Sequence, residues 1–326
     1  MRARVLSGMR PTGALHLGHY FGTLANRVRL QHEGHEVFVV VADYQVITDR
    51  DDPGPLRDTV RELVRDYLAV GLDPDRTVVF PHSAVPALNQ LLLPFLALVG
   101  KGELERNPTV KDEIRSAGRA TVSGLMLTYP VHQAADILFC KGELVPVGKD
   151  QLPHLEVCRT IARRFNERYA PVFPLPDALL GEVPVLRGLD GRKMSKSLGN
   201  AIALSDPREV IAAKIRAART DSARTITYEP DTRPDVANLL TIAGLCSGRT
   251  PADLADEIGA AGAAALKAHT IEAVDALLAP LRARRAAISD ADVSRVLKRG
   301  IATAREIADT TLAEVNAAMG MDVIAL

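Results

Sequence analysis

Residues 4–22 read Arg-Val-Leu-Ser-Gly-Met-Arg-Pro-Thr-Gly-Ala-Leu-His-Leu-Gly-His-Tyr-Phe-Gly, and this stretch decides the fold. It predicts a short strand at Val5 and Leu6, a glycine-containing loop, and a helix that begins at about Gly18 and His19. The first N–H groups of a helix lack partners within it and carry partial positive charge, so this order of elements is typical of phosphate sites. The spacing matches neither Gly-x-Gly-x-x-Gly nor a Walker loop, which excludes those two motifs.

Two histidines frame the start of that helix. His16 and His19 stand three residues apart and share one helical face, from which both rings can donate hydrogen bonds to phosphate oxygens. Gly18 between them leaves room for a purine against the backbone. A capped helix start or half of a metal site would show the same pair, so the segment alone leaves these alternatives open.

A second motif, Lys-Met-Ser-Lys-Ser, stands far along the chain at residues 193–197 and is flanked by glycines. Lys193 and Lys196 can therefore be placed on a triphosphate by a flexible loop and withdrawn afterwards. The hydroxyls of Ser195 and Ser197 add hydrogen-bond donors. The alternative is an exposed, mobile lysine loop that binds no ligand.

The chain has 326 residues, of which 47% are hydrophobic, enough for a sizeable core and two domains. Strands and helices alternate up to about residue 200, which predicts an α/β half built on a parallel sheet. From Asp206 onward the pattern is helical only, with start signals at Asp206-Pro207 and Ser289-Asp290. We therefore expect domains at 1–200 and 201–326.

Individual elements follow from hydrophobic periodicity. In the first half we expect strands at Glu36–Ala42, Thr77–Phe80 and Leu144–Val147, helices at Tyr20–Glu33, Pro55–Val70, Pro86–Val99, Val122–Lys141 and Gln151–Phe165, a polar, basic loop at Gly102–Arg119 and a proline-rich stretch at Pro171–Pro184. In the second half we expect helices at Pro207–Ala218, Asp235–Leu245, Pro251–Glu257, Ala263–Arg285 and Asp290–Met319.

Composition excludes several classes of protein. No apolar leader precedes the first strand and no apolar run is long enough to span a bilayer, so we expect a cytoplasmic protein without membrane contact. Cys140, Cys158 and Cys246 lie far apart, which argues against a zinc knuckle or a disulfide framework. The formal net charge of zero ordinarily argues against a nucleic acid as a partner, and we expect no DNA binding. Local Arg and Lys clusters such as Lys214–Arg219 could nevertheless face a phosphate backbone, or simply form a solvated helix face.

A third cluster indicates an amino-acid pocket. Tyr129, Gln133 and Asp136 recur at helical spacing and share one face. An inward carboxylate and amide must meet hydrogen-bond donors, which a ligand would supply. An internal cap or salt-bridge partner is the alternative role of Asp136.

The His-Leu-Gly-His and Lys-Met-Ser-Lys-Ser motifs resemble the two signatures of class I aminoacyl-tRNA synthetases, and the text around the first motif resembles the tryptophanyl-tRNA synthetase family. The resemblance implies a Rossmann-like catalytic domain at 1–200, a dimerisation insertion at about 85–140 and an all-α anticodon-binding domain at 201–326. It implies ATP-dependent activation of L-tryptophan to tryptophanyl-adenylate, transfer to tRNA(Trp), and a homodimer. Mg²⁺ would arrive with ATP and not in a protein metal site.

The resemblance also assigns residues. Those implied to be catalytic are His16, His19, Lys193, Ser195 and Lys196. Those implied to bind ATP are Arg10, Pro11, Thr12, Gly18, His19, Gly148, Lys149, Asp150, Val185, Lys193, Met194, Ser195, Lys196 and Ser197. Those implied to bind tryptophan are Gly8, Asp43, Gln45, Tyr129, Gln133, Asp136 and Gln151, with Asp136 accepting the indole N–H. For Asp150, an ordinary helix cap would look the same.

The chain departs from the family pattern within the pocket. Arg10 stands where many relatives carry glutamine, Asp43-Tyr44-Gln45 replaces Asp-Gln-His, and Gln133 replaces a frequent methionine. A tyrosine-specific enzyme of the same fold is therefore the nearest alternative. A second alternative is a paralogue that binds ATP or tryptophan without charging tRNA, but such a protein has no need of the two lysines. A third is a small-molecule nucleotidylyltransferase, which the lysine motif and the all-helical second half disfavour.

Overall fold

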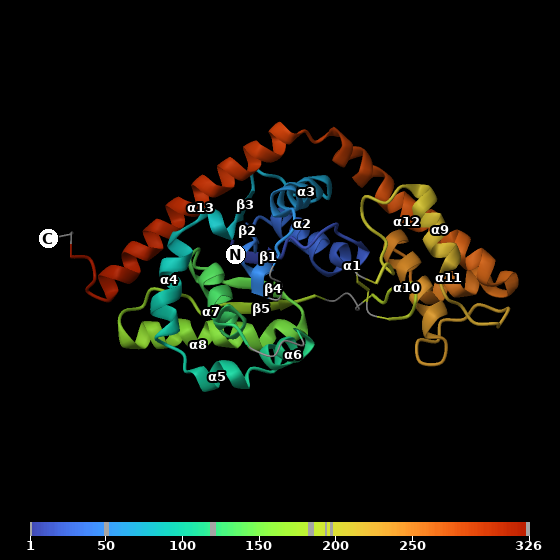
Figure 1. Cartoon of the computed structure of the whole chain (residues 1–326). Coiled ribbons are helices and arrows are strands. Elements are labelled where there is room, and N and C mark those ends of the chain that lie inside the picture. The colour runs from blue at the N-terminus through green and yellow to red at the C-terminus, as the bar shows by residue number, and fades with distance from the viewer. Residues whose placement is uncertain are drawn as a thin grey trace.

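A five-stranded parallel sheet forms the centre of the first half (Figure 1). The computed structural model describes residues 2–48, 52–117, 122–181, 186–192, 194–195 and 198–323. The strands lie in the order β3-β2-β1-β4-β5, so the order reverses direction between β1 and β4, which is where α/β sheets open a crevice for ligands. Their bounds are β1 Arg4–Met9, β2 Glu36–Val41, β3 Thr77–Pro81, β4 Leu144–Val147 and β5 Asp177–Leu180.

The sequence of the central strand β2 is typical of a strand that is buried on both faces. In β2 every residue after Glu36 is buried, as expected for a valine-rich strand of a parallel sheet. It pairs residue for residue with β1, from Arg4 with Glu36 to Met9 with Val41. The expected strands are confirmed.

Two parts of the first half differ from the sequence expectation. The proline-rich stretch contains β5, whose short and largely exposed run lacks β-branched residues and is held by pairing with β4. The expected loop at Gly102–Arg119 was wrong, because helices α5 (Lys101–Arg106) and α6 (Pro108–Ala117) form there. A distant contact supports α5: Arg164 pairs with Glu103, whose carboxylate also accepts the N–H of Gly100.

The first helical segment is built from three pieces. It starts with α1 (Leu17–His19), continues through a π-helical turn at Tyr20–Leu24 and ends with α2 (Ala25–His32). From α2, the fully buried Arg27 donates to the Ser7 hydroxyl at 2.8 Å and to the Gly8 carbonyl at 3.0 Å. This cation therefore anchors the helix to the end of β1.

The remaining helices confirm the predicted alternation and the helical second half. Those of the first half are α3 Leu56–Ala69, α4 Ala87–Leu96, α7 Gly124–Leu138 and α8 Leu152–Arg168, with short 3₁₀ turns at Tyr44–Thr48, His82–Ala84 and Lys149–Gln151. Those that follow are α9 Arg208–Ala217, α10 Pro234–Ser247, α11 Pro251–Ile258, α12 Gly262–Ala287 and α13 Asp290–Ala318. Within the described ranges, no helix combines the length and apolarity needed to cross a bilayer.

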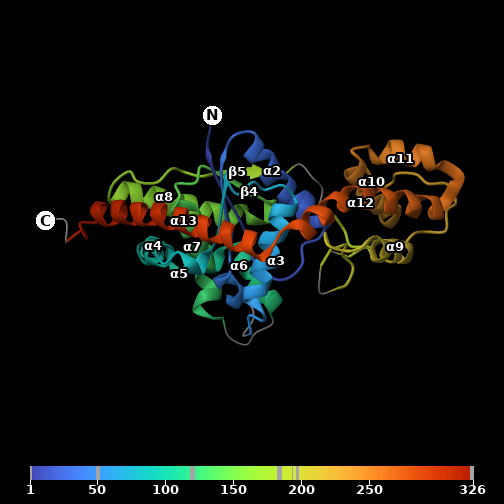
Figure 2. The ribbon, with the colours of Figure 1, turned by 90° about the horizontal axis from the view of Figure 1, so that it is seen from above.

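The last helix leaves the helical cluster and runs back over the sheet. Helices α9 to α12 gather at one end of the molecule, whereas α13 extends along the α/β half (Figures 1 and 2). Ala304, Ala308 and Val315 of α13 belong to the same buried cluster as Phe38 and Phe80 of the sheet. The domain boundary at residue 200 stays a prediction, and by its packing α13 is part of the first half.

Gly300 sets the distance between α13 and edge strand β3. A Cβ at this position would lie 1.9 Å from the Val79 carbonyl oxygen, so the helix backbone rests directly on the strand backbone. A covering helix also protects a sheet edge from pairing with another chain.

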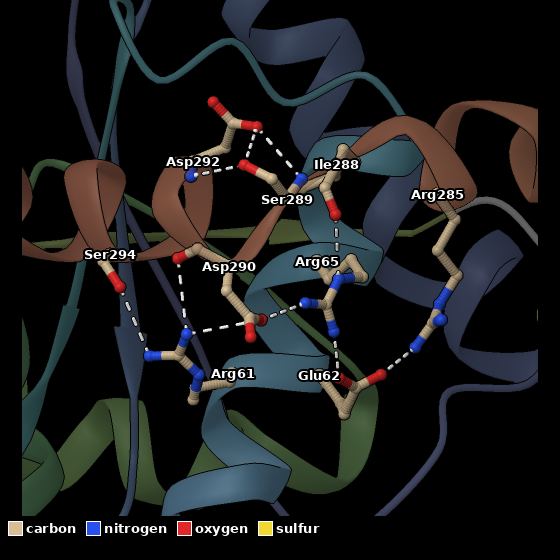
Figure 3. Close-up of polar contacts among 9 residues, drawn as sticks. All are labelled: Arg61, Glu62, Arg65, Arg285, Ile288, Ser289, Asp290, Asp292 and Ser294. Carbon is tan, nitrogen blue, oxygen red and sulfur yellow. Dashed lines mark hydrogen bonds and ion pairs between the residues drawn. The ribbon is translucent and has the colours of Figure 1, made fainter.

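The corner between α12 and α13 is anchored on α3 by charged groups (Figure 3). Arg65 donates to the Ile288 carbonyl at 3.3 Å and pairs with Asp290 at 2.5 Å. Arg285 pairs with Asp66 at 2.6 Å. Ser289 caps α13 as predicted, its hydroxyl accepting the Asp292 N–H at 3.1 Å. These contacts place the helical cluster beside the sheet.

Gly300→Ala is expected to lower the free energy of unfolding by about 3 kcal/mol, because the methyl group forces backbone apart from backbone. Gly124→Ala is the matched control, since a Cβ there meets no described atom within 4 Å. The thermal midpoints of both variants measure the effect. Equal midpoints would show that α13 does not rest on β3 as described.

Candidate active site

A cavity of about 310 Å³ opens at the carboxyl ends of β1 and β4, the place that the strand order predicts. Eight of the residues proposed from the sequence line it: Gly8, Arg10, Gln45, Tyr129, Gln133, Asp136, Gly148 and Gln151. Glu113 of α6 and Thr48 line it as well. The sheet thus brings together residues that are spread between positions 6 and 151 of the sequence.

Other predicted residues lie elsewhere. Thr12, Lys149 and Asp150 are exposed and Pro11 is buried, and none of them lines the cavity. The carboxylate of Asp43 accepts the Ser83 N–H at 3.0 Å and the Tyr44 N–H at 3.1 Å. Its tryptophan-binding role stays a prediction.

The two histidines of the first motif form a compact unit. The His16 backbone N–H donates to Nδ1 of His19 at 3.2 Å, and the ring centroids lie 3.7 Å apart. Because Nδ1 of His19 accepts, the neutral ring carries its proton on Nε2. His19 thus caps the start of the helix, and its hydrogen bond with the His16 N–H orients the His19 ring.

The two sequence motifs are adjacent in space. Leu17 N–H donates to the Ile202 carbonyl at 3.0 Å and Leu204 N–H to the Leu15 carbonyl at 2.9 Å. A Cβ on Gly18 would lie 3.3 Å from the sulfur of Met194, so the first helix and the lysine motif touch at a glycine. Val185, Lys193, Lys196 and Ser197 lie outside the described residues.

Asn200 organises the described part of the lysine loop. Its side-chain oxygen accepts the Ser195 N–H at 2.8 Å, and its amide nitrogen donates to Asp190 at 2.8 Å. The hydrogen bond from Asn200 and the contacts with Arg192 lower the pKa of Asp190 to about 2. The Asn200 side chain thus joins Asp190, which precedes the lysine motif, to Ser195 within it.

Asp136 lies in a buried polar cluster at one side of the cavity. Its Oδ1 pairs with Nδ1 of His82 at 2.5 Å, and its Oδ2 accepts from Nε2 of Gln45 at 3.3 Å. Gln45 also donates to Nδ1 of His132 at 3.2 Å. Asp136 is therefore a salt-bridge partner, the alternative role considered from the sequence, and it also lines the cavity, while its role in binding the amino acid stays a prediction.

The pKa values of the two histidines in this cluster, His82 and His132, are shifted in opposite directions. Burial lowers the pKa of His82, but the Asp136 carboxylate, together with smaller effects of Asp43 and Asn89, raises the pKa overall. Burial and the neighbouring His82 lower the pKa of His132 to about 4. One imidazole thus favours the charged form beside Asp136, and the other stays neutral and accepts from Gln45.

A second chain of contacts joins two other predicted residues. The Tyr129 hydroxyl lies 2.8 Å from Nε2 of His154, whose Nδ1 lies 3.3 Å from Oε1 of Gln151. Gln151 in turn donates to Asp150 at 2.9 Å. Burial lowers the pKa of His154 to about 4, so this ring is neutral at physiological pH.

Sequence reasoning missed several of these residues. His82 directly follows strand β3, so its place at a strand's carboxyl end was a usable signal. His154 follows Gln151 by three residues and shares its helical face. For Glu113 and Asn200 no local pattern separates them from ordinary surface residues. Among the described residues, no group of three or more His, Cys, Asp or Glu side chains could hold a metal ion.

The family model described as "tRNA synthetases class I (W and Y)" matches residues 1–279. The chain belongs to this family of class I tRNA synthetases.

The individual relatives narrow the assignment. The chain is 43% identical to the tryptophan–tRNA ligase of Treponema pallidum over 98% of its own length and 97% of that protein. It is 48% identical to that of Thermotoga maritima over 70% of each chain. The solved tryptophanyl-tRNA synthetase of Campylobacter jejuni, complexed with ADP and tryptophan, superposes with a TM-score of 0.85 at 30% identity and covers 97% of this chain and 99% of its own. Within the family, the chain groups with the tryptophan–tRNA ligases.

The buried neutral histidines predict a loss of stability in acid. His132 and His154 stay neutral in the folded state down to about pH 4, whereas in the unfolded chain they bind protons near pH 6.5. Their contribution is therefore complete above pH 6.5 and falls as the pH drops towards 4. The raised pKa of His82 acts in the opposite direction.

In His154→Gln the unfolded chain takes up one proton fewer between pH 6.5 and 4, because glutamine does not titrate. The thermal midpoint of this variant should therefore decline less steeply over that range than the midpoint of the unmodified chain. Thermal unfolding across that range measures the difference. Parallel profiles would mean that His154 is not held neutral by burial.

Proposed function

We propose that this chain is a tryptophan–tRNA ligase that activates L-tryptophan with ATP and transfers it to tRNA(Trp). The observation that carries the proposal is the contact between the two motifs beside a cavity lined by Tyr129, Gln133 and Asp136. Its full-length similarity to tryptophan–tRNA ligases supports tryptophan over tyrosine.

In the activation step, the tryptophan carboxylate attacks the α-phosphorus of ATP and the bond to pyrophosphate breaks, leaving tryptophanyl-adenylate. The protein needs chiefly to position the reactants and to stabilise charge that moves onto the leaving group. We assign the α-phosphate region to His16, His19 and the N–H groups of the helix start, and the leaving pyrophosphate to Lys193 and Lys196. Mg²⁺ would bridge the phosphates as part of the ATP substrate.

The remaining contacts are assigned from the resemblance to the tryptophanyl-tRNA synthetase family. Gly148, Lys149 and Asp150 would hold the ribose and adenosine, and Gln151 the amino acid. The Asp136 carboxylate would accept the indole N–H, since it lines the cavity and each of its oxygens has a second lone pair.

Assembly and location stay predictions. We propose a homodimer formed through the insertion at about 85–140 and anticodon recognition by the helices that follow residue 201. A cytoplasmic location and the lack of DNA binding also rest on the sequence alone.

ATP–pyrophosphate exchange with each amino acid tests the substrate. We expect exchange that depends on L-tryptophan, because the relatives and the cavity both favour it. Exchange with tyrosine and none with tryptophan would overturn the assignment. Exchange without charging of purified tRNA(Trp) would identify a paralogue that does not complete the reaction.

Lys196→Gln is expected to slow activation by about 10²–10³-fold, because one transition-state cation is lost. Single-turnover formation of the adenylate measures the step. Lys298→Gln on the exposed face of α13 is the control and should keep the full rate. A Lys196 variant as fast as the control would remove this lysine from the mechanism.

A further inference from the structure

Arg27 is a fully buried cation whose contacts are with neutral groups. It donates to the Ser7 hydroxyl at 2.8 Å and to the Gly8 carbonyl at 3.0 Å. Its guanidinium carbon lies 5.2 Å from the centroid of the Tyr67 ring, and the hydroxyl of that ring is a further neutral partner. These contacts hold the guanidinium in one place directly behind the end of β1.

No carboxylate pairs with this guanidinium in the part of the chain that the structure describes. Asp66, which precedes Tyr67, pairs with Arg285 at 2.6 Å instead. Taking a charge out of water without a counter-charge is costly, and an apolar side chain could pack the helix on the sheet without that cost. The buried charge of Arg27 therefore indicates a function besides packing.

The contact with Arg27 determines what the Ser7 hydroxyl can do. Arginine can only donate, so the Ser7 oxygen accepts from Nε of Arg27 and keeps its own proton for another acceptor. Ser7 is only 4% exposed, and the described residues supply no acceptor for this proton. A hydroxyl whose oxygen accepts from a cation is polarised, which makes it a stronger donor.

Ser7 lies in the wall of the active-site cavity. Ser7 and Gly8 belong to the carboxyl-terminal half of β1, and both line the cavity of about 310 Å³. The substrates of the proposed reaction carry acceptors that suit a strong donor, namely the tryptophan carboxylate and the α-phosphate of ATP, which react with each other in the activation step. Hydrogen bonds to such charged oxygens are stronger than those to neutral acceptors.

We propose that the Ser7 hydroxyl donates to an anionic oxygen of the bound substrates, with Arg27 as the positioning residue that orients and polarises this hydroxyl. The oxygen belongs to the tryptophan carboxylate or to a phosphate of ATP, which share the same acceptor chemistry. No covalent bond is made or broken at Ser7 in this role. The inference rests on the proposed function, since it takes its acceptor from the substrates of that reaction.

Ser7→Ala tests the donor in binding titrations that pair each substrate with an analogue without its anionic group. The dissociation constant for L-tryptophan or for ATP should rise about 10- to 100-fold, as expected for the loss of a hydrogen bond to a charged group. Tryptamine, which lacks the carboxylate, and adenosine, which lacks the phosphates, should bind the variant and the unmodified chain equally. A rise for tryptophan assigns the donor to the carboxylate, and a rise for ATP assigns it to a phosphate.

Arg27→Met tests the positioning residue, because methionine fills much of the same space without charge or donors. It should weaken binding of the same substrate by a similar factor, and combining it with Ser7→Ala should add no further loss. Arg29→Met is the matched control, since it removes the same charge from the exposed face of α2. It should leave every dissociation constant unchanged.

Unchanged dissociation constants of Ser7→Ala for both tryptophan and ATP would overturn the inference. An equal loss of affinity for tryptamine or adenosine would overturn it as well, because it would show a purely structural role. Additive losses in the double variant would show that Arg27 does not act through Ser7. If Arg27→Met does not fold, the small substitution Ser7→Ala still decides the donor. Failure of the proposed function is distinguishable, since the unmodified chain would then show no exchange with tryptophan.

Discussion

The site depends on a backbone bridge between two segments that are far apart in sequence. Residues 15–17, which lead into the first helix, exchange hydrogen bonds with residues 202–204, which follow the lysine motif. Backbone hydrogen bonds tolerate almost any side chain but demand close approach. Gly18 permits that approach, since it lies against both His16 and Met194. The start of the first helix and Met194 of the lysine motif are therefore held beside each other.

Polar groups beside the cavity form two chains of hydrogen bonds. Asp136 anchors the first, which runs through Gln45 to the neutral ring of His132. Asp150 anchors the second, which runs through Gln151 and His154 to Tyr129. In each chain a carboxylate that can only accept orients an amide, and the amide determines which ring nitrogen carries the proton. Such chains orient groups at the cavity without a metal ion among the described residues.

Helix α13 links the stability of the two halves. Its corner with α12 is held on α3 by ion pairs (Figure 3), and its middle rests on β3 at Gly300. Much of the corner is exposed, and exposed ion pairs contribute little free energy. The apolar contacts of Ala304, Ala308 and Val315 with the sheet therefore hold the helix, while the charges specify where it turns.

Most of the strands and the long helices could be predicted from the sequence, because hydrophobic periodicity is a local property. Of the eight predicted residues that line the cavity, Tyr129, Gln133 and Asp136 follow from helical spacing, and the other five were implied by the resemblance to the synthetase family. Helices α5 and α6 and strand β5 could not, because distant partners such as Arg164 and β4 stabilise them. The sequence by itself determined the α/β class and the two motifs that define the family. Only the tertiary structure decided that His82 pairs with Asp136, that His154 contacts Tyr129 and that Glu113 lines the cavity. Proton positions and charge states depend on neighbours in space, and no spacing along the chain records them.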